Sequence, residues 1–290
     1  MEIKILSKLN ILPKAVIPNH YDISLDVDFD SFKFEGSEDI QIEILKPVSE
    51  IVLNSVDLEI INVSFLSDQD LDLSKPKITL NNEYLKIDFG QQIPACTGVL
   101  KIDFYGTLSD DLKGFYKASY KDEDDSVKYL ATTQFEATDA RRAFPCWDEP
   151  NFKAIFSISI ISDKKYLRIS NEKVLEENIL DHGKVETKFV DSMVMSSYLV
   201  AFVIGPLEVT EIGKVKDTLV RIVHRPGFGK DTKFAGQAAL KILEFFEDYY
   251  EINYPGSKLD LIAIPDFAMG AMENIGAVTF RESLLITNSP

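Results

Sequence analysis

Short stretches of strict apolar and polar alternation constrain the fold of this chain more than any other feature of its sequence. From His20 to Asp30 every second residue is apolar, and most of the residues between them are aspartate. A period of two places the apolar side chains on one face of a β-strand and leaves the other face to water. The same alternation recurs at residues 40–44, 85–89, 100–104 and 155–161. Repeated short strands of this kind predict mainly β structure, with antiparallel sheets packed into a sandwich or an open barrel.

The β-rich pattern changes near Gly205 and Pro206, a turn dipeptide that follows an apolar run. We therefore expect a first domain over residues 1–205 and a second region over residues 206–290. The second region contains the one convincing helical pattern, over residues 231–250, with Asp231 as the expected N-cap. A strand is expected at residues 259–264. The second region is short for an independent α/β core, so we expect it to be the beginning of a longer domain.

The charge balance bears on possible partners. The chain has 47 acidic and 31 basic residues, which gives a formal net charge of -16. Such a surface repels phosphate backbones and anionic lipids, so we expect neither a nucleic-acid nor a membrane partner. The charge is compatible with a cationic ligand such as an amine, and equally with a surface that only keeps the protein in solution.

The cysteines and the N-terminal residues give information on the cellular compartment of the protein. Cys96 and Cys146 lie far apart and match no metal or disulfide spacing, so both are expected to be reduced apolar residues. Residues 1–12 lack the continuous apolar run of a signal peptide. We therefore expect a cytoplasmic location.

The segment Gly-Ala-Met-Glu-Asn at residues 270–274 is the first of two polar segments with functional potential. Gly270 has no Cβ, so another backbone can approach it, and an exposed strand beside it could pair with an extended peptide. Glu273 would then be free to pair with a charged amine. A short loop with an exposed glutamate is also common without any function, so the residues alone leave both interpretations open.

The second polar segment spans residues 133–150 and contains Trp147, the only tryptophan of the chain. Four of its charged residues are expected to form an ion-pair network that holds the loop against the sandwich; they are Arg141, Arg142, Asp148 and Glu149. Gln134 and Glu136 have no equally simple structural explanation.

Together these segments give the chain a resemblance to a known family. Through residues 17–21 (Ile-Pro-Asn-His-Tyr), 134–150, the hydrophobic run that ends at Gly205, and 259–282, it resembles the N-terminal part of the zinc-dependent aminopeptidases of the gluzincin class. That family includes aminopeptidase N, the leukotriene hydrolase and the archaeal tricorn-interacting factors. The resemblance covers essentially the whole chain. It implies a saddle-like N-terminal β-sandwich followed by the beginning of a thermolysin-like α/β catalytic domain.

The resemblance also implies a substrate site. Glu136 and Glu273 would hold the free α-amino group of a peptide, because two carboxylates give an ammonium charge-assisted hydrogen bonds and reject an acylated nitrogen. The backbone of Gly270 and Ala271 would align the peptide, and Met269, Ala271 and Gln134 would lie near the pocket for its first side chain. The candidate substrate-binding residues are Gln134, Glu136, Met269, Gly270, Ala271, Met272, Glu273 and Asn274. Ile275 and Phe280 depart from residues common in the family, so the preferred substrate does not transfer.

Hydrolysis in this family requires a zinc ion held by the two histidines of an H-E-x-x-H helix and a later glutamate. The chain has three histidines, His20, His182 and His224, and no two are four residues apart. We therefore expect no catalytic residue and no metal ligand here, and no peptide cleavage by the chain alone. Zinc would belong to a longer parent enzyme, at a site beyond residue 290. The alternative is a natural non-catalytic module that binds peptide N-termini or docks a catalytic subunit. The sequence does not predict the oligomeric state.

Overall fold

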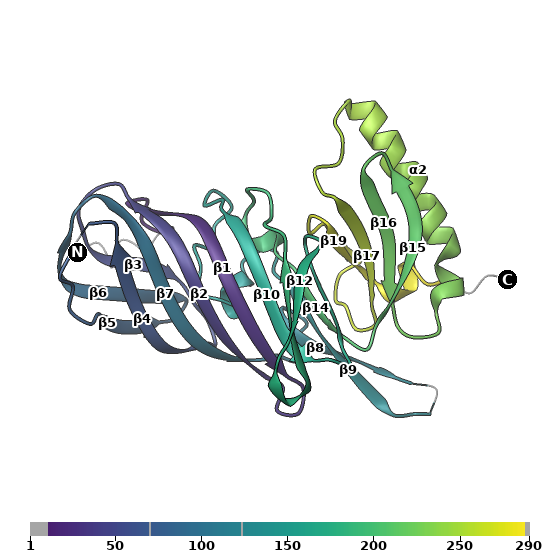
Figure 1. Cartoon of the computed structure of the whole chain (residues 1–290), viewed down its shortest axis with the longest axis horizontal. Coiled ribbons are helices and arrows are strands. Elements are labelled where there is room, and N and C mark those ends of the chain that lie inside the picture. The colour runs from purple at the N-terminus through teal and green to yellow at the C-terminus, as the bar shows by residue number, and fades with distance from the viewer. Residues whose placement is uncertain (1–10, 70, 123, 288–290) are drawn as a thin grey trace.

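The computed structural model describes residues 11–69, 71–122 and 124–287, and these residues form mostly strands, as the alternation predicts (Figure 1). The strands are arranged in four sheets within the described ranges. Residues 1–10, which make up most of the segment compared with a signal peptide, lie outside the described residues. No helix in the described part of the chain is long and apolar enough to cross a membrane.

The largest sheet has seven strands. In order across the sheet they are β12 (Val174–Ile179), β13 (Lys184–Phe189), β10 (Ile155–Asp163), β1 (Val16–Asp28), β2 (Lys33–Ile44), β7 (Cys96–Thr107) and β4 (Glu59–Ser67). The alternating residues of β1 behave as predicted, since Ile23 and Leu25 are fully buried. The prediction of antiparallel sheets in this region is confirmed, and the sheet also contains one parallel pair, β1 and β10. Alternation reports which face of a strand is buried and carries no information on the direction of its neighbour.

Two smaller sheets complete the β-rich part of the chain. One consists of β3 (Val48–Asn54), β6 (Tyr84–Ile93) and β5 (Lys77–Asn81). The other consists of β11 (Leu167–Ser170), β14 (Phe202–Gly205), β9 (Val127–Gln134) and β8 (Gly114–Lys121). Short 3-10 helices lie in the connections: η1 (Ala140–Arg142), η2 (Asp181–Gly183) and η3 (Ser197–Leu199).

The fourth sheet has five strands and is covered by a helix. Its order is β15 (Glu208–Val215), β16 (Thr218–His224), β17 (Lys258–Ile264), β19 (Ala277–Arg281) and β18 (Ala271–Met272). The strands β16, β17 and β19 are parallel, and β15 and β18 are antiparallel to their neighbours. The short helix η4 (Gly229–Thr232) and the helix α2 (Lys233–Tyr250) connect β16 to β17, and η5 (Glu282–Leu284) follows β19.

Three apolar cores lie between these layers. The first lies between the seven-stranded sheet and one face of the four-stranded sheet, which contributes Phe202. The second fills the space between the other face, at Val203, and the five-stranded sheet, at Ile262. The third joins Leu261 on β17 to Leu243 on α2. The four-stranded sheet is thus the central layer, buried on both faces (Figure 1).

The predicted helix exists, but its start and its packing face differ from the expectation. It begins at Lys233, and Asp231 lies in η4 and is not the N-cap. The Thr232 hydroxyl donates to the Gly229 carbonyl instead of capping the helix, and this bond belongs to the tighter turn of η4. Four of the apolar residues that indicated the helix are exposed: Ile242, Phe245, Phe246 and Tyr249. The sheet packs against an adjacent side of the helix, which buries Ala235 and Leu243.

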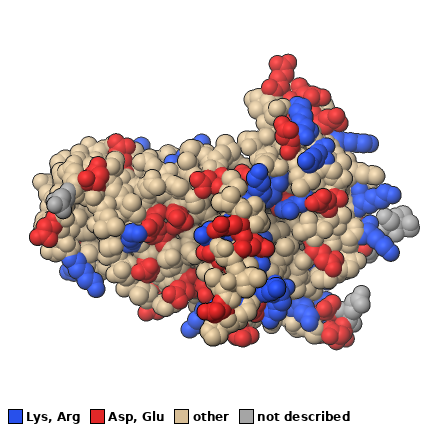
Figure 2. All heavy atoms as spheres, viewed as in Figure 1, with Lys and Arg blue, Asp and Glu red and all other residues tan. Residues whose placement is uncertain are grey.

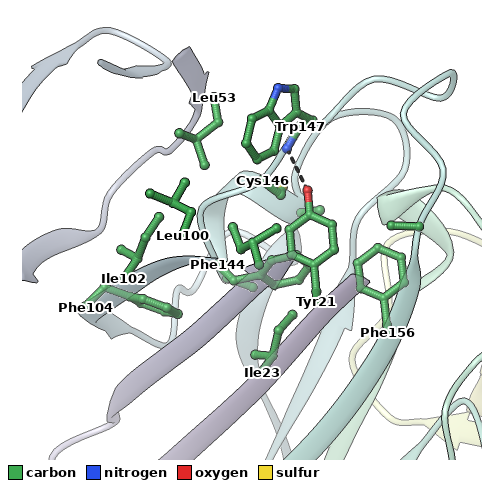
Figure 3. Close-up of a cluster of buried hydrophobic side chains, with 14 of the residues drawn as sticks. Tyr21, Ile23, Leu53, Leu100, Ile102, Phe104, Phe144, Cys146, Trp147 and Phe156 are labelled. Carbon is green, nitrogen blue, oxygen red and sulfur yellow. Dashed lines mark hydrogen bonds between the residues drawn. The ribbon is translucent and has the colours of Figure 1, made fainter. Parts of the chain in front are cut away.

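The segment 133–150 contributes Phe144, Cys146 and Trp147 to the first core (Figure 3). The ring of Phe144 lies 6.0–6.3 Å, centre to centre, from four other rings, those of Tyr21, Phe135, Phe156 and Phe202. The Trp147 backbone N–H donates to the Tyr21 hydroxyl at 3.2 Å, the bond drawn in Figure 3. Aromatic side chains bury large areas and gain further from such edge contacts.

The expected ion-pair network is present around this core. Arg141, 7% exposed, pairs with Asp148 at 2.9 Å and with Glu83 at 2.7 Å. Arg142 pairs with Asp139 and Asp57. The fourth expected member, Glu149, forms no ion pair among the described residues and instead accepts a hydrogen bond from the Leu12 backbone N–H. The network therefore ties the loop to turns that lie far away in the sequence.

Replacing Phe144 by alanine should destabilise the protein strongly, because it leaves a cavity among four rings. We expect the free energy of unfolding, measured by urea denaturation, to fall by about 3–5 kcal/mol. The matched control is Phe245→Ala on α2, at a ring 60% exposed, where the change should stay within about 0.5 kcal/mol. An equal loss of unfolding free energy in the two variants would contradict the assignment of Phe144 to the first core.

Candidate functional site

Gln134 and Glu136 lie where β9 ends. Gln134 is the last residue of β9 and faces Gly114, the first residue of β8. The Gln134 side chain is buried, and its Oε1 atom accepts no hydrogen bond from any described residue. Phe135 enters the first core, so the next side chain, Glu136, points out and is exposed. The buried acceptor of Gln134, next to an exposed carboxylate, is one half of the candidate site.

The other half is the loop between β17 and β19. Met272 is 1% exposed and packs in the second core, and Asn274 is 2% exposed. The Asn274 amide donates to the Ala277 carbonyl and to the Thr279 hydroxyl, both at 3.4 Å. These two side chains hold the loop in place. The other predicted residues of this segment, Met269, Gly270, Ala271 and Glu273, are exposed.

The short strand β18 lies at the edge of the five-stranded sheet and pairs with β19 on one side only. The Arg281 backbone N–H donates to the Gly270 carbonyl at 2.9 Å, which fixes the start of β18. A Cβ atom at Gly270 would approach only the Leu284 side chain, at 3.8 Å, so there is space beside this residue. An edge strand with open space can accept the backbone of an extended peptide.

Tyr116 connects the two halves. It lies on β8 opposite Thr132, two residues before Gln134 on β9. Its hydroxyl donates to the carbonyl of Asp266, at the start of the loop that carries Glu273, at 3.1 Å. Burial raises the pKa of the Tyr116 hydroxyl, which therefore stays protonated as a donor. Both halves are thus anchored at the boundary between the four-stranded and five-stranded sheets.

Glu136 and Glu273 differ from other acidic residues of this region because neither has an ion-pair or hydrogen-bond partner among the described residues. Glu282, next to β19, pairs with Arg225 through two nitrogen atoms at 2.5 and 2.7 Å. Asp260 on β17 is paired in the same way with Arg221. The two glutamates predicted to hold an amine are therefore free to accept hydrogen bonds from a ligand.

The histidines do not form a zinc site. His224 donates through Nδ1 to the Arg225 carbonyl at 2.7 Å, and its Nε2 atom is bonded to the Thr210 hydroxyl at 2.8 Å. The Nε2 atom of His20 is bonded to Ser157, and His182 lies in η2. Within residues 11–69, 71–122 and 124–287, no group of three His, Cys, Asp or Glu side chains could hold a metal. The zinc ion that the resemblance implies therefore does not fit the residues described here.

Sequence reasoning missed three residues that support the site: Tyr116, Asn171 and Lys258. Asn171 donates from one amide nitrogen to the carbonyls of Leu199 and Ile275, both at 2.8 Å, next to the predicted segment. Lys258 is 3% exposed at the start of β17. Lys258 and Asp260 are charged residues in an otherwise apolar strand, which is a signal that could have drawn attention to Lys258, whereas Tyr116 and Asn171 leave no such signal.

Figure 2 shows acidic and basic side chains interspersed over the visible face. Many charged side chains of the described residues are paired. Lys184 with Asp26, and Lys188 with Glu176, are examples on the seven-stranded sheet. Charge alone therefore does not mark the candidate site.

Comparison with known proteins identifies the family of the chain. Residues 17–199, more than half of the chain, match the Peptidase M1 N-terminal domain, and residues 234–290 match the Peptidase family M1 domain. The boundary between the two matches lies in the region that contains β14, β15 and β16.

Several curated proteins are similar to the whole chain. Aminopeptidase M1-B of Oryza sativa subsp. japonica is 41% identical over 276 residues, which cover 95% of this chain and 31% of that protein. Aminopeptidase M1 of Arabidopsis thaliana is 40% identical, over 95% of this chain and 32% of that protein. Endoplasmic reticulum aminopeptidase 2 of Homo sapiens is 39% identical, over 95% of this chain and 29% of that protein. This chain spans less than a third of the length of these relatives, and it belongs to the M1 family of peptidases.

Proposed function

We propose that the protein is an aminopeptidase and that the residues described here bind the free α-amino group of its peptide substrate. The proposal depends on one observation above all. Glu136 and Glu273 are exposed and unpaired on two segments that Tyr116 anchors at one sheet boundary. The relatives named as aminopeptidases support the reaction class. Because the chain spans less than a third of their length, the activity of the whole protein is part of the proposal.

The chemistry of the site suits an ammonium group. A protonated α-amine has three N–H donors, and two carboxylates accept them through charge-assisted hydrogen bonds. Gln134 adds a buried acceptor, Oε1, that has no partner among the described residues. Acylation removes the positive charge and leaves one N–H donor, so an acylated peptide would leave carboxylate oxygens without partners.

The edge strand β18 would set the direction in which the peptide substrate lies. A peptide that extends along β18 would form main-chain hydrogen bonds with its free edge. Met269 and Ala271 are exposed beside this edge and would contact the first side chains of the peptide. The binding mode accounts for a preference for the N-terminus, because only the first residue of a peptide carries an ammonium on its backbone.

Hydrolysis is not assigned to the described residues. The zinc ion of the resemblance would supply an activated water when bound, and we propose that its ligands lie outside residues 1–290. For the protein as a whole we propose peptides with a free N-terminus as partners. We also propose a cytoplasmic location, with which the free, buried thiols of Cys96 and Cys146 are compatible.

Glu273→Gln should weaken the binding of a free-amine peptide while leaving the fold intact. Replacing the carboxylate by an amide removes one charge-assisted partner of the ammonium. The dissociation constant of trialanine, measured by calorimetric titration, should therefore rise by about 10- to 100-fold. Glu136→Gln should act in the same direction.

The matched control is Glu244→Gln on α2, at another exposed glutamate without an ion-pair partner among the described residues. It should leave the dissociation constant unchanged. N-acetylated trialanine should bind the unaltered protein no better than it binds the Glu273→Gln variant. If acetylated and free peptides bind equally well, the proposed amine site is wrong.

We also expect the 290-residue chain to hold no tightly bound zinc and to leave trialanine uncleaved. The reason is that a stable zinc site needs three or four ligands, which the described residues do not bring together. Metal analysis after dialysis and mass spectrometry of the incubated peptide test this. One zinc ion per chain, or release of alanine, would contradict the prediction.

A further inference from the structure

Lys258 places a buried ammonium group behind the candidate site. Its Nζ atom donates to the Ser170 carbonyl at 2.9 Å and to the Gly276 carbonyl at 2.7 Å. It also pairs with the Asp260 carboxylate at 2.8 Å. An ammonium has three N–H donors, so these three acceptors satisfy it completely.

The two carbonyls belong to different sheets. Ser170 ends β11 in the four-stranded sheet, in which β9 leads to Gln134 and Glu136. Gly276 lies in the turn before β19 in the five-stranded sheet, three residues after Glu273. The Lys258 side chain therefore forms hydrogen bonds both to the sheet that leads to Glu136 and to the turn that follows Glu273.

The turn at Gly276 is held from several sides. Its backbone N–H donates to the Tyr254 hydroxyl at 2.7 Å, and its carbonyl also accepts from the Asp260 backbone N–H at 3.0 Å. Gly276 has φ +75°, and a Cβ atom there would lie 2.0 Å from the Asn171 carbonyl oxygen. Only glycine allows the two sheets to approach this closely at this conformation.

Asp260 does not by itself explain a second buried cation. Arg221 already binds both oxygen atoms of Asp260, at 2.6 and 2.8 Å. Burial lowers the pKa of Lys258, and the adjacent Asp260 opposes that shift. What Lys258 contributes beyond charge balance is the pair of hydrogen bonds to Ser170 and Gly276.

We propose that Lys258 is a positioning residue for the amine site, which fixes Glu273 relative to Glu136 by joining the two sheets behind them. This inference rests on the proposed amine-binding function. Lys258 is buried and touches no ligand, so it acts through the turn at residues 274–277. Loss of its ammonium would leave two carbonyls without this donor and let the turn move away from β11.

The test uses Lys258→Met, which keeps an unbranched side chain and removes the cation. Two quantities are measured: amide hydrogen exchange of residues 274–277, and the ratio of the dissociation constants of N-acetylated and free trialanine. We expect exchange in the turn to become about tenfold faster. We expect the ratio of dissociation constants to fall about tenfold.

Arg168→Met is the matched control. Arg168 is also a buried cation that donates to two carbonyls, those of Asp163 and Tyr166, but it lies on the side of β11 that faces β10 and β13. This variant should lose stability and keep both the exchange rates of the turn and the discrimination between the peptides. If Lys258→Met folds with both quantities unchanged, or if Arg168→Met alters them equally, the proposal is wrong.

If the Lys258→Met variant does not fold, a second pair of variants tests the proposal. Lys258→Arg keeps the cation, whereas Lys258→Gln keeps only polarity, so the arginine variant should discriminate better and protect the turn better. Equal behaviour of these two variants would overturn the positioning role. If the unaltered protein does not distinguish the two peptides, the amine site itself fails. The exchange rates then decide separately whether Lys258 holds the turn.

Discussion

Burial of both faces of the four-stranded sheet is the constraint on which the rest of the structure depends. Successive residues of β14, Phe202 and Val203, enter two different cores. A sheet with two apolar faces needs a layer on each side, so the seven-stranded and five-stranded sheets are both packed against it. The end of β9 and the loop after β17 are brought to one boundary as a result. The hydrogen bond from Tyr116 to Asp266 and the bonds of Lys258 then fix that boundary locally.

Much of the fold could be predicted because half-buried strands leave a local signal. The alternation around Ile23 and Leu25 correctly predicted the strand β1 and its buried face. Strands buried on both faces, such as β14 and β17, have no alternation, so their neighbours could not be inferred. The parallel pairing of β1 with β10 depends on contacts between residues far apart in the sequence. The packing face of α2 was hidden for a related reason, since apolar residues occur on both the buried and the exposed side of the helix.

The candidate site was accessible to sequence reasoning only in part. The segment 270–274 and Glu136 stood out in the sequence, and their roles came from the resemblance. The structure adds that Met272 and Asn274 are buried, whereas Glu273 is exposed. The unpartnered acceptor of Gln134 became visible only with the fold. Tyr116 and Lys258 could not be assigned a role in advance, because each acts through a bond to a residue more than eighty positions away.

The central claim is that one peptide ammonium binds between Glu136 and Glu273. The most direct measurement is carbon-13 nuclear magnetic resonance of the glutamate side-chain carboxyls during a titration with trialanine, with signals assigned by single substitutions. We expect the signals of Glu136 and Glu273 to shift together at one dissociation constant, and N-acetylated trialanine to leave them unchanged. Shifts at only one of the two, or at glutamates elsewhere on the surface, would show that the ammonium does not bind between them.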